Sequence, residues 1–235
     1  TPSKSDIEPK IARLLLKLLQ KKRVAIIGGG HFKQFQKQLT KKLGSSVKNL
    51  GNLFLFPANS TSFYRFKNAK WRKIYGHNLT NPEKKKIFEA FKKSFRKNKY
   101  QKPKKVYGKV IEDRDSQITF SALGQKAPLL LKEEWNKNND VRKKLMKSLK
   151  RFLPGFEIRQ GGLTSIDVTG KGIDKAYGVK QIKKTLKIPI KKMLFVGDAL
   201  FPGGNDYSVK KTGIDCLRVK GPAETARLIK KLLID

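Results

Sequence analysis

Apolar residues near the start of the chain follow two different patterns. They first recur at helical spacing, which predicts an amphipathic helix, at Ile11, Leu14, Leu15, Leu18 and Leu19. A wholly apolar run, Val24–Ile27, then stops at three glycines, and a second helical pattern opens at Phe32. Helix, buried strand, glycine turn and helix in this order are typical of a parallel α/β sheet.

The last third of the chain returns to this order of elements. A helical pattern covers residues 173–186, and the apolar run 193–196 precedes Gly197 and Asp198. A glycine-rich loop, a short helix, a strand over 215–219 and a final helix from Pro222 are predicted to follow. The two ends of the sequence therefore predict one α/β core.

The middle of the chain mixes short strands with basic helices. Leu53–Phe56 is a further buried strand, and the aromatic stretch 59–75 predicts hairpins. Beyond it we predict a basic helix over 81–105, strands over 107–120, an amphipathic helix over 141–152, and two strands over 156–168 around Gly161 and Gly162. We therefore expect residues 1–80 and 170–235 to form the α/β core, with residues 81–169 inserted as an α+β segment.

Composition adds one exceptional feature, the charge. The 235 residues include 55 Lys and Arg against 18 Asp and Glu, a net charge of +37, whereas small soluble domains usually carry a magnitude of roughly 2–8. The lysine-rich stretch 84–109 holds aromatic residues at near-helical spacing, which favours a core-facing helix with a solvated basic face over a base-stacking platform. We expect no specific nucleic-acid partner and leave unspecific polyanion binding open.

Cysteine, histidine and hydropathy limit the remaining classes. A single cysteine, Cys216, excludes an internal disulfide, and two histidines argue against a cysteine or histidine metal cluster. No apolar run approaches the roughly 20 residues that span a bilayer. We therefore expect no membrane partner and a cytoplasmic location.

The sharpest chemical pattern is the stretch Gly-Asp-Ala-Leu-Phe-Pro-Gly-Gly-Asn-Asp, residues 197–206. It places Asp198 at the carboxyl end of a parallel strand, where open α/β sheets bind ligands, and Asp206 eight residues later. Two carboxylates suit Mg²⁺. An ordinary turn, in which aspartate caps a helix and glycines adopt positive φ, is the alternative, and the loop alone does not decide.

Two weaker patterns indicate anion binding. Lys175 opens a helix after a glycine-containing stretch, where its ammonium group can reach an anion at the sheet edge, although a lysine in so basic a chain is more often merely solvated. The glycines at 28–30 offer backbone N–H groups to phosphate. That run is neither a P-loop nor a dinucleotide-binding fingerprint.

These stretches, taken in order, resemble the haloacid-dehalogenase (HAD) superfamily, and within it the eukaryotic-type phosphomannomutase-like branch of subfamily IIB. Four segments carry the resemblance, which covers nearly the whole chain: 24–39, 111–124, 161–177 and 195–207. Residues 162–167 and the Pro-Gly-Gly-Asn-Asp of 202–206 are the most discriminating. The resemblance implies a Rossmannoid parallel-sheet core with an inserted α+β cap.

The resemblance also implies a mechanism, Mg²⁺-dependent phosphoryl transfer on a small phosphorylated sugar. In the family, the first Asp of a D-x-D motif attacks the phosphoryl group to form an aspartyl-phosphate, and the second Asp is the general acid and base. By motif match, Asp198 is a Mg²⁺ ligand, and Asp206 supports the metal through water or a hydrogen bond. Lys175 holds the nucleophile and phosphate, and Gly29 and Gly30 occupy the phosphate-binding turn.

The family's first motif, D-x-D-G-T-L-T-P-S, is matched only by its tail, Thr1-Pro2-Ser3. We expect the missing part to precede Thr1, and we expect the 235 residues alone to be catalytically inactive. The glycine turn also reads Gly-Gly-Gly-His where the mutases have Gly-Gly-Ser-Asp, so a hydroxyl contact to phosphate is lost.

In the inserted segment, the resemblance assigns substrate binding to four residues. Arg114 matches a mutase arginine that grips the second phosphate of a sugar bisphosphate, and Ser165 and Asp167 match residues that bind sugar hydroxyls. Gln125 stands where the mutases have another arginine, which binds phosphate better than an amide does. We therefore expect a phosphatase. The alternatives are a sugar phosphomutase, in which Lys126 or Lys132 supplies the missing charge, and an inactive HAD relic that binds polyanions.

Overall fold

The computed structural model describes residues 5–44, 49–137 and 140–234. The chain divides into two compact units, the first made of Thr1–Gly76 with Asp174–Asp235 and the second of His77–Ile173. The sequence motif at Thr1-Pro2-Ser3 lies outside the described residues.

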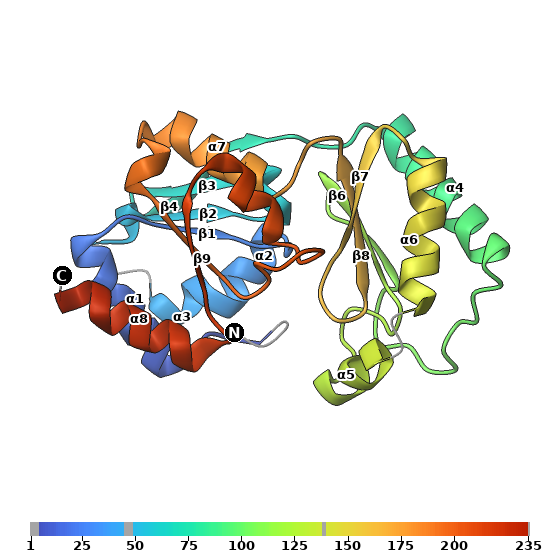
Figure 1. Cartoon of the computed structure of the whole chain (residues 1–235), viewed down its shortest axis with the longest axis horizontal. Helices are drawn as coiled ribbons and strands as arrows, with labels where there is room; N and C mark the ends of the chain where they lie inside the picture. Colours follow the sequence, from blue (N-terminus) through green and yellow to red (C-terminus); the bar gives the residue numbers. More distant parts are fainter. Residues whose placement is uncertain (1–4, 45–48, 138–139, 235) are drawn as a thin grey trace. The chain divides into compact units, whose positions relative to one another are not determined.

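The first unit contains a four-stranded sheet in the order β1-β2-β3-β4 (Figure 1). In it β1 (Val24–Ile27) runs parallel to β2 (Leu53–Phe56). The aromatic stretch forms the predicted hairpin, β3 (Ser62–Lys67) and β4 (Lys70–Gly76), which is antiparallel. A separate two-stranded sheet pairs β9 (Leu194–Gly197) in parallel with β10 (Asp215–Arg218).

The helices of the first unit begin close to the predicted positions. They are α1 (Pro9–Lys21), α2 (Phe32–Phe35), which continues through a π-helical turn η1 (Gln36–Thr40) into α3 (Lys41–Leu43), α7 (Lys175–Leu186) and α8 (Pro222–Ile234). Short 3₁₀ segments are η2 (Leu50–Asn52), η3 (Ala58–Ser60), η4 (Ile190–Lys192) and η5 (Tyr207–Thr212). Leu15 and Leu19 of α1 pack in one apolar cluster with Leu53 and Leu55 of β2, as the helical spacing predicts.

Two parallel strands of the first unit have an open edge. Within the described residues β1 pairs only with β2, and β9 pairs only with β10. All four residues of β2, which has a neighbour on each side, are buried, whereas all four of β1 are half-buried. Leu194 of β9 is 44% exposed. Both strands therefore offer backbone N–H and C=O groups to a further strand.

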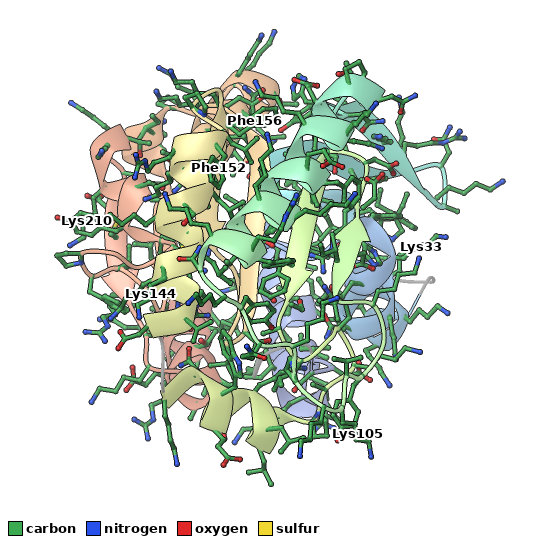
Figure 2. All side chains as sticks on the ribbon, turned by 90° about the vertical axis from the view of Figure 1, so that its right-hand side faces the viewer. Lys33, Lys105, Lys144, Phe152, Phe156 and Lys210 are labelled. Atoms are coloured by element: carbon green, nitrogen blue, oxygen red, sulfur yellow. The ribbon has the colours of Figure 1, made fainter. Side chains whose placement is uncertain are left out.

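The second unit is an antiparallel sheet covered by helices on one face. Its strands lie in the order β5 (Ile111–Asp113), β6 (Gln117–Ser121), β8 (Ser165–Gly170) and β7 (Phe156–Gln160). The helices are α4 (Asn81–Lys97), α5 (Leu129–Lys137) and α6 (Asp140–Phe152). Figure 2 shows Lys144 of α6 extending away from the sheet.

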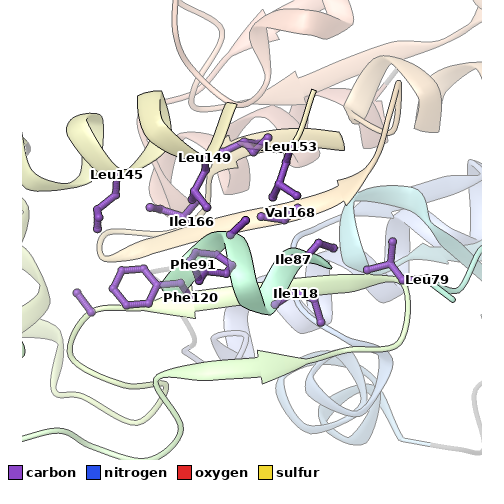
Figure 3. Packing of buried hydrophobic residues seen from close by; sticks show 13 residues of the cluster. Leu79, Ile87, Phe91, Ile118, Phe120, Leu145, Leu149, Leu153, Ile166 and Val168 are labelled. Carbon is purple, nitrogen blue, oxygen red and sulfur yellow. The ribbon is translucent and has the colours of Figure 1, made fainter. Parts of the chain in front are cut away.

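Strand alternation separates an apolar face of this sheet from a polar one. Ile118 and Phe120 of β6 and Ile166 and Val168 of β8 point toward α4 and α6 and form the core shown in Figure 3. Their sequence neighbours point the opposite way, because successive side chains of a strand alternate between faces. The polar face is therefore made of Gln117, Thr119 and Ser121 on β6 and Ser165, Asp167 and Thr169 on β8.

Helix α4 is shorter than the sequence predicts. It begins with a capping box between Thr80 and Glu83, but it ends at Lys97 and not near 105. The N–H of Asn98 donates to the Ser94 carbonyl at 3.1 Å, and Lys99 then adopts φ 47°, which ends the helix. Among the helices of the described segments, none has the length and apolar character needed to span a bilayer.

Candidate active site

The carboxyl end of β9 leads directly into the predicted acidic loop. Asp198, the residue after the strand, is exposed. The loop turns back on itself through two hydrogen bonds, from the N–H of Gly204 to the Phe201 carbonyl at 2.9 Å and from the N–H of Asp206 to the Ala199 carbonyl at 3.3 Å. A Cβ on Gly204 would overlap the Ala199 carbonyl oxygen, so this close turn requires glycine.

Asp206 is the buried anchor of this loop, with 1% of its surface exposed. Its Oδ2 accepts a hydrogen bond from the Ala199 N–H at 3.1 Å, and its Oδ1 forms an ion pair with the Nζ of Lys175. The same ammonium donates to Asn205 Oδ1 at 3.3 Å. Asp206 therefore fixes both the peptide that follows Asp198 and the position of the Lys175 ammonium group.

The carboxylates of this loop fit a Mg²⁺ ion in unequal roles. Mg²⁺ keeps several waters and is commonly held by one or two carboxylates together with substrate phosphate. Asp198 is an accessible carboxylate at a strand end and suits direct contact with the metal. Asp206 already accepts a hydrogen bond from Ala199 and pairs with Lys175, so it suits support of the metal through water or a hydrogen bond. Within the described residues no group of three or more His, Cys, Asp or Glu is placed to hold a metal, so metal binding stays a prediction.

Lys175 is the first residue of α7, and the helix starts where Asp174 caps it. The Asp174 Oδ1 accepts a hydrogen bond from the N–H of Tyr177 at 2.8 Å. The Lys175 side chain is only 14% exposed. Helix capping and the ion pair with Asp206 together hold the Lys175 ammonium group next to the loop that contains Asp198.

The glycine turn after β1 is tied to the end of β2. The N–H of Ala58 donates to the Gly30 carbonyl at 2.8 Å, and the N–H of Asn59 donates to the Gly28 carbonyl at 2.9 Å. Gly29 and Gly30 thus lie between the carboxyl end of β1 and the start of α2, where the resemblance places the phosphate-binding turn. His31 caps α2, with its Nδ1 accepting from the Gln34 N–H at 3.2 Å.

A left-handed turn that the sequence analysis missed supports this arrangement. Ala58, Asn59 and Ser60 have φ angles of 49°, 55° and 74°, a conformation that costs non-glycine residues energy and persists where its surroundings enforce it. The Ser60 carbonyl accepts a hydrogen bond from the Tyr75 hydroxyl at 3.1 Å. Of the three, only asparagine hints at such a backbone in the sequence.

In the second unit, three of the predicted substrate-binding residues belong to one hydrogen-bonded chain. Arg114 pairs through Nε with Glu112 Oε2 at 2.7 Å and donates through Nη2 to Gln125 Oε1 at 3.1 Å. Gln125 Nε2 donates to Ser121 Oγ at 2.9 Å, and Ser121 Oγ lies 2.8 Å from Ser165 Oγ. Arg114, Gln125 and Ser165 are therefore brought together on the polar face of the sheet.

Asp167, the fourth predicted residue, lies two positions beyond Ser165 on the same face of β8. Its Oδ1 accepts from Thr119 Oγ1 at 2.8 Å, and Thr119 Oγ1 accepts from Gln117 Nε2 at the same distance. Asp167 and Ser165 are 5% and 6% exposed, so a ligand on this face would meet largely desolvated groups.

Arg142 is a supporting residue without a motif that could have revealed it. This arginine is fully buried, and burial lowers its pKa to about 10. Its Nη1 donates to the carbonyls of Gly162 and Leu163 at 2.9 and 2.6 Å, and its Nη2 donates to Asn136 Oδ1 at 2.6 Å. Arg142 therefore fixes the loop that leads into Ser165.

Known proteins resemble this chain over nearly its whole length. A sequence profile of the family described as "Eukaryotic phosphomannomutase" matches residues 11–235. The phosphomannomutase of Saccharomyces cerevisiae is 26% identical over 241 residues, an alignment that covers 99% of this chain and 89% of the yeast protein.

Solved structures resemble this one in fold. An N-terminally truncated IMP-nucleotidase of Plasmodium falciparum has a TM-score of 0.72 at 18% identity and covers 99% of this chain and 67% of its own. A haloacid dehalogenase-like hydrolase from Bacteroides thetaiotaomicron has a TM-score of 0.64 at 12% identity, covering 99% and 95%. These likenesses support the HAD-type α/β fold predicted from the sequence.

Proposed function

Since this chain belongs to the eukaryotic phosphomannomutase family, within the HAD superfamily, we propose that it catalyses Mg²⁺-dependent phosphoryl transfer on a small phosphorylated sugar, with hydrolysis as the net reaction. The observation that carries the proposal is the contact of Asp206 with both Lys175 and the Ala199 peptide. It sets a fixed cation beside an accessible carboxylate, Asp198, at the ligand-binding edge of a parallel sheet.

In this proposal each group of the first unit has a defined task. The Lys175 ammonium group and the N–H groups of the turn at Gly29 and Gly30 bind the oxygens of the transferring phosphoryl group. Asp198 would hold Mg²⁺, which neutralises charge between nucleophile and phosphate when it is bound. The aspartyl nucleophile forms a bond to phosphorus as the bond to the sugar oxygen breaks, and water then releases inorganic phosphate from the acyl phosphate.

The attacking carboxylate is proposed to lie on a further parallel strand between β1 and β9. The open edges of both strands support this position, as does the half-buried state of β1 beside the buried β2. A strand there would end at the same sheet edge as Gly28 and Asp198.

Hydrolysis is favoured over isomerisation because of Gln125. A mutase must retain a sugar bisphosphate and hold each phosphate in turn, whereas Gln125 supplies a neutral amide in place of a guanidinium group. The second candidate is a phosphomannomutase, which the names of the related proteins favour, and it keeps the same residues in the first unit.

The test uses protein extended by the residues encoded upstream of Thr1. Phosphorus NMR follows the conversion of each phosphate ester with time. Substrates are the 1- and 6-phosphates of mannose and glucose, with Mg²⁺ and a trace of sugar bisphosphate. Inorganic phosphate that accumulates first supports the phosphatase, and exchange between 1- and 6-phosphates with little free phosphate supports the mutase. No turnover of any ester contradicts both, and so does turnover that survives Asp198→Asn. Asp215→Asn, an exposed aspartate on β10, is the matched control.

A further inference from the structure

We propose that Gln125 is a positioning residue that sets the orientation of the Arg114 guanidinium group and makes Ser165 a hydrogen-bond donor to the substrate. The inference rests on the proposed function, because it concerns how the second unit binds the sugar end of a phosphorylated sugar. It assigns Gln125 a role of its own, where the sequence analysis treated this position only as the loss of an arginine.

The first step is that Gln125 completes the fixing of Arg114. The Arg114 side chain is 5% exposed, and its Nε is held by Glu112 at 2.7 Å. A second contact, from Nη2 to Gln125 Oε1 at 3.1 Å, lies on another nitrogen of the same planar group. Two partners on two nitrogens fix the plane of the guanidinium group, and orientation of that plane decides which ligands it can bind.

The second step is that Arg114 fixes the orientation of the Gln125 amide. An amide can be turned over to exchange its oxygen and nitrogen. The opposite orientation would place the NH₂ group of Gln125 against Nη2 of Arg114, donor against donor. The oxygen of Gln125 must therefore face Arg114, and its NH₂ group must face Ser121.

The third step carries the direction of donation to Ser165. Gln125 Nε2 donates to Ser121 Oγ at 2.9 Å. Of the two possible directions between Ser121 and Ser165, whose Oγ atoms lie 2.8 Å apart, we infer donation from Ser121, because Ser121 is fully buried and the reverse direction would leave its proton without an acceptor. With its oxygen accepting from Ser121, Ser165 has its proton available for a further acceptor. A sugar oxygen bound at this face would receive that proton.

The same geometry opposes an arginine at position 125. A guanidinium group has no acceptor atom, so Gln125→Arg removes the acceptor for Nη2 of Arg114 and sets two cations side by side. The guanidinium group of the new arginine can still donate a hydrogen bond to Ser121. The substitution is therefore expected to disturb Arg114 and not to add a second phosphate-binding fork.

The kinetic test compares Gln125→Met, Gln125→Glu and Gln125→Arg in the extended protein. Gln125→Met has similar length and no hydrogen bonds, and we expect it to raise KM for the sugar phosphate about tenfold, as for a lost charge-assisted contact. Its kcat should change less than KM, and the rise in KM should be smaller for phenyl phosphate, which lacks the sugar, than for the sugar phosphate. Gln125→Glu keeps the acceptor for Arg114 and should recover part of the loss in KM, whereas Gln125→Arg should not. Gln101→Met, at an exposed glutamine, is the control.

A spectroscopic test is independent of turnover. We expect the Nε–H resonance of Arg114, assigned by its loss in Arg114→Lys, to be resolved in the unsubstituted protein and in Gln125→Glu. In Gln125→Met the resonance should move and the Nη protons should no longer rotate slowly, in protein that circular dichroism shows to be folded at the temperature of the measurement. An Arg114 signal identical in Gln125→Met, or equal kinetic losses with sugar phosphate and phenyl phosphate, would overturn the inference. Absence of turnover in the unsubstituted protein would instead contradict the proposed function and leave the NMR result as the deciding one for Gln125.

Discussion

The hydroxyl of Ser60 occupies the space where a side chain on Gly178 would lie. A Cβ built on Gly178 overlaps Ser60 Oγ and lies 2.9 Å from Ile27 Cδ1. Gly178 is on α7, one turn after Lys175, and Ser60 belongs to the left-handed turn that holds Gly28 and Gly30. This contact therefore couples the helix turn that begins at Lys175 to the glycine turn that follows β1.

Gly178→Ala is expected to destabilise the protein even though alanine favours a helix. The gain in helix propensity is up to about 1 kcal/mol, while overpacking of a fitted contact costs roughly 1–3 kcal/mol. Denaturant unfolding measures the difference. Gly221→Ala, which meets nothing within 4 Å, is the control.

Ser60→Gly should rescue Gly178→Ala, because it removes the hydroxyl and suits the φ of 74° at position 60. The double variant is therefore expected to be more stable than Gly178→Ala alone. Equal stability of the two would show that the contact with Ser60 is not the cause of the loss.

The strands of the first unit could be predicted from the sequence because they are wholly apolar. Val24–Ile27 and Leu53–Phe56 each pair at the predicted residues. Helix α5 could not be predicted, because Leu129, Leu130 and Leu131 are consecutive and are 37%, 79% and 37% exposed. Three adjacent exposed leucines give neither a helical nor a strand period.

The site was predictable only where local motifs carry it. Lys175, Asp198 and Asp206 stand in motifs, and the structure brings Lys175 and Asp206 into an ion pair, while Asp206 accepts a hydrogen bond from the N–H of Ala199. The roles that the motifs assign to the three residues stay predictions. The contact between Ser121 and Ser165 spans 44 positions and depends on the register of β6 with β8. Likewise, the turn at Ala58–Ser60 contains no glycine, and Asn59 alone is too weak a signal to predict three consecutive positive φ angles.

Breaking the pair between Lys175 and Asp206 is expected to cost far more stability than breaking a surface pair. The two side chains are 14% and 2% exposed, and removing one partner of a buried pair leaves an uncompensated charge, at about 3–5 kcal/mol. Asp206→Asn should therefore lower the free energy of unfolding strongly. The control is Asp140→Asn, which breaks a pair with Lys143 whose side chains are 72% and 68% exposed and should cost about 0–1 kcal/mol. Similar losses in both variants would contradict the anchoring role of Asp206.

The capping box of α4 predicts a pH dependence of stability. Glu83 Oε2 accepts from the Thr80 N–H at 2.7 Å, and this backbone contact, followed by the Thr80 side-chain contact, holds the pKa of Glu83 below its ordinary value. A lowered folded pKa means that the contribution is fully present above the unfolded pKa of about 4.3. It is lost as the pH falls through the folded value.

The stability difference between the unsubstituted protein and Glu83→Gln should therefore be larger at pH 7 than at pH 3. Because Glu83 is largely solvated, we expect a fraction of a kcal/mol. Unfolding at both pH values measures it. Glu133→Gln, at an exposed glutamate of α5, should show no such difference, and a Glu83→Gln effect that is the same at both pH values would exclude the ionised cap.

Binding of polyanions is expected to follow charge without a preferred site. The lysines extend outward from both units, as Lys33 and Lys210 of the first and Lys105 and Lys144 of the second show in Figure 2. Counterion release predicts that affinity for DNA falls with salt, with a log–log slope of about −0.9 for each phosphate neutralised.

Two matched triple variants test whether any one surface dominates this binding. Each replaces three exposed lysines of one helix by glutamine, Lys85, Lys92 and Lys93 of α4 in one variant and Lys180, Lys183 and Lys184 of α7 in the other. We expect similar, partial reductions of the salt slope in both. Loss of binding in the α4 variant alone, or a sequence preference that persists at high salt, would establish a specific nucleic-acid surface on the second unit.

Mg²⁺ binding should be measurable as stabilisation, without any assay of turnover. A ligand that binds only the folded state stabilises by RT ln(1 + [L]/Kd), about 2.7 kcal/mol at a hundredfold excess over Kd. Mg²⁺ should therefore raise the melting temperature of the extended protein, and Asp198→Asn should remove that rise, because it takes away the accessible carboxylate at the end of β9. Asp206→Asn is expected to weaken the rise by displacing the Ala199 peptide, to which Asp206 is bonded at 3.1 Å. Asp215→Asn should leave it intact. If the Mg²⁺ effect is equal in Asp198→Asn and in the unsubstituted protein, the metal binds elsewhere and the role of Asp198 is wrong.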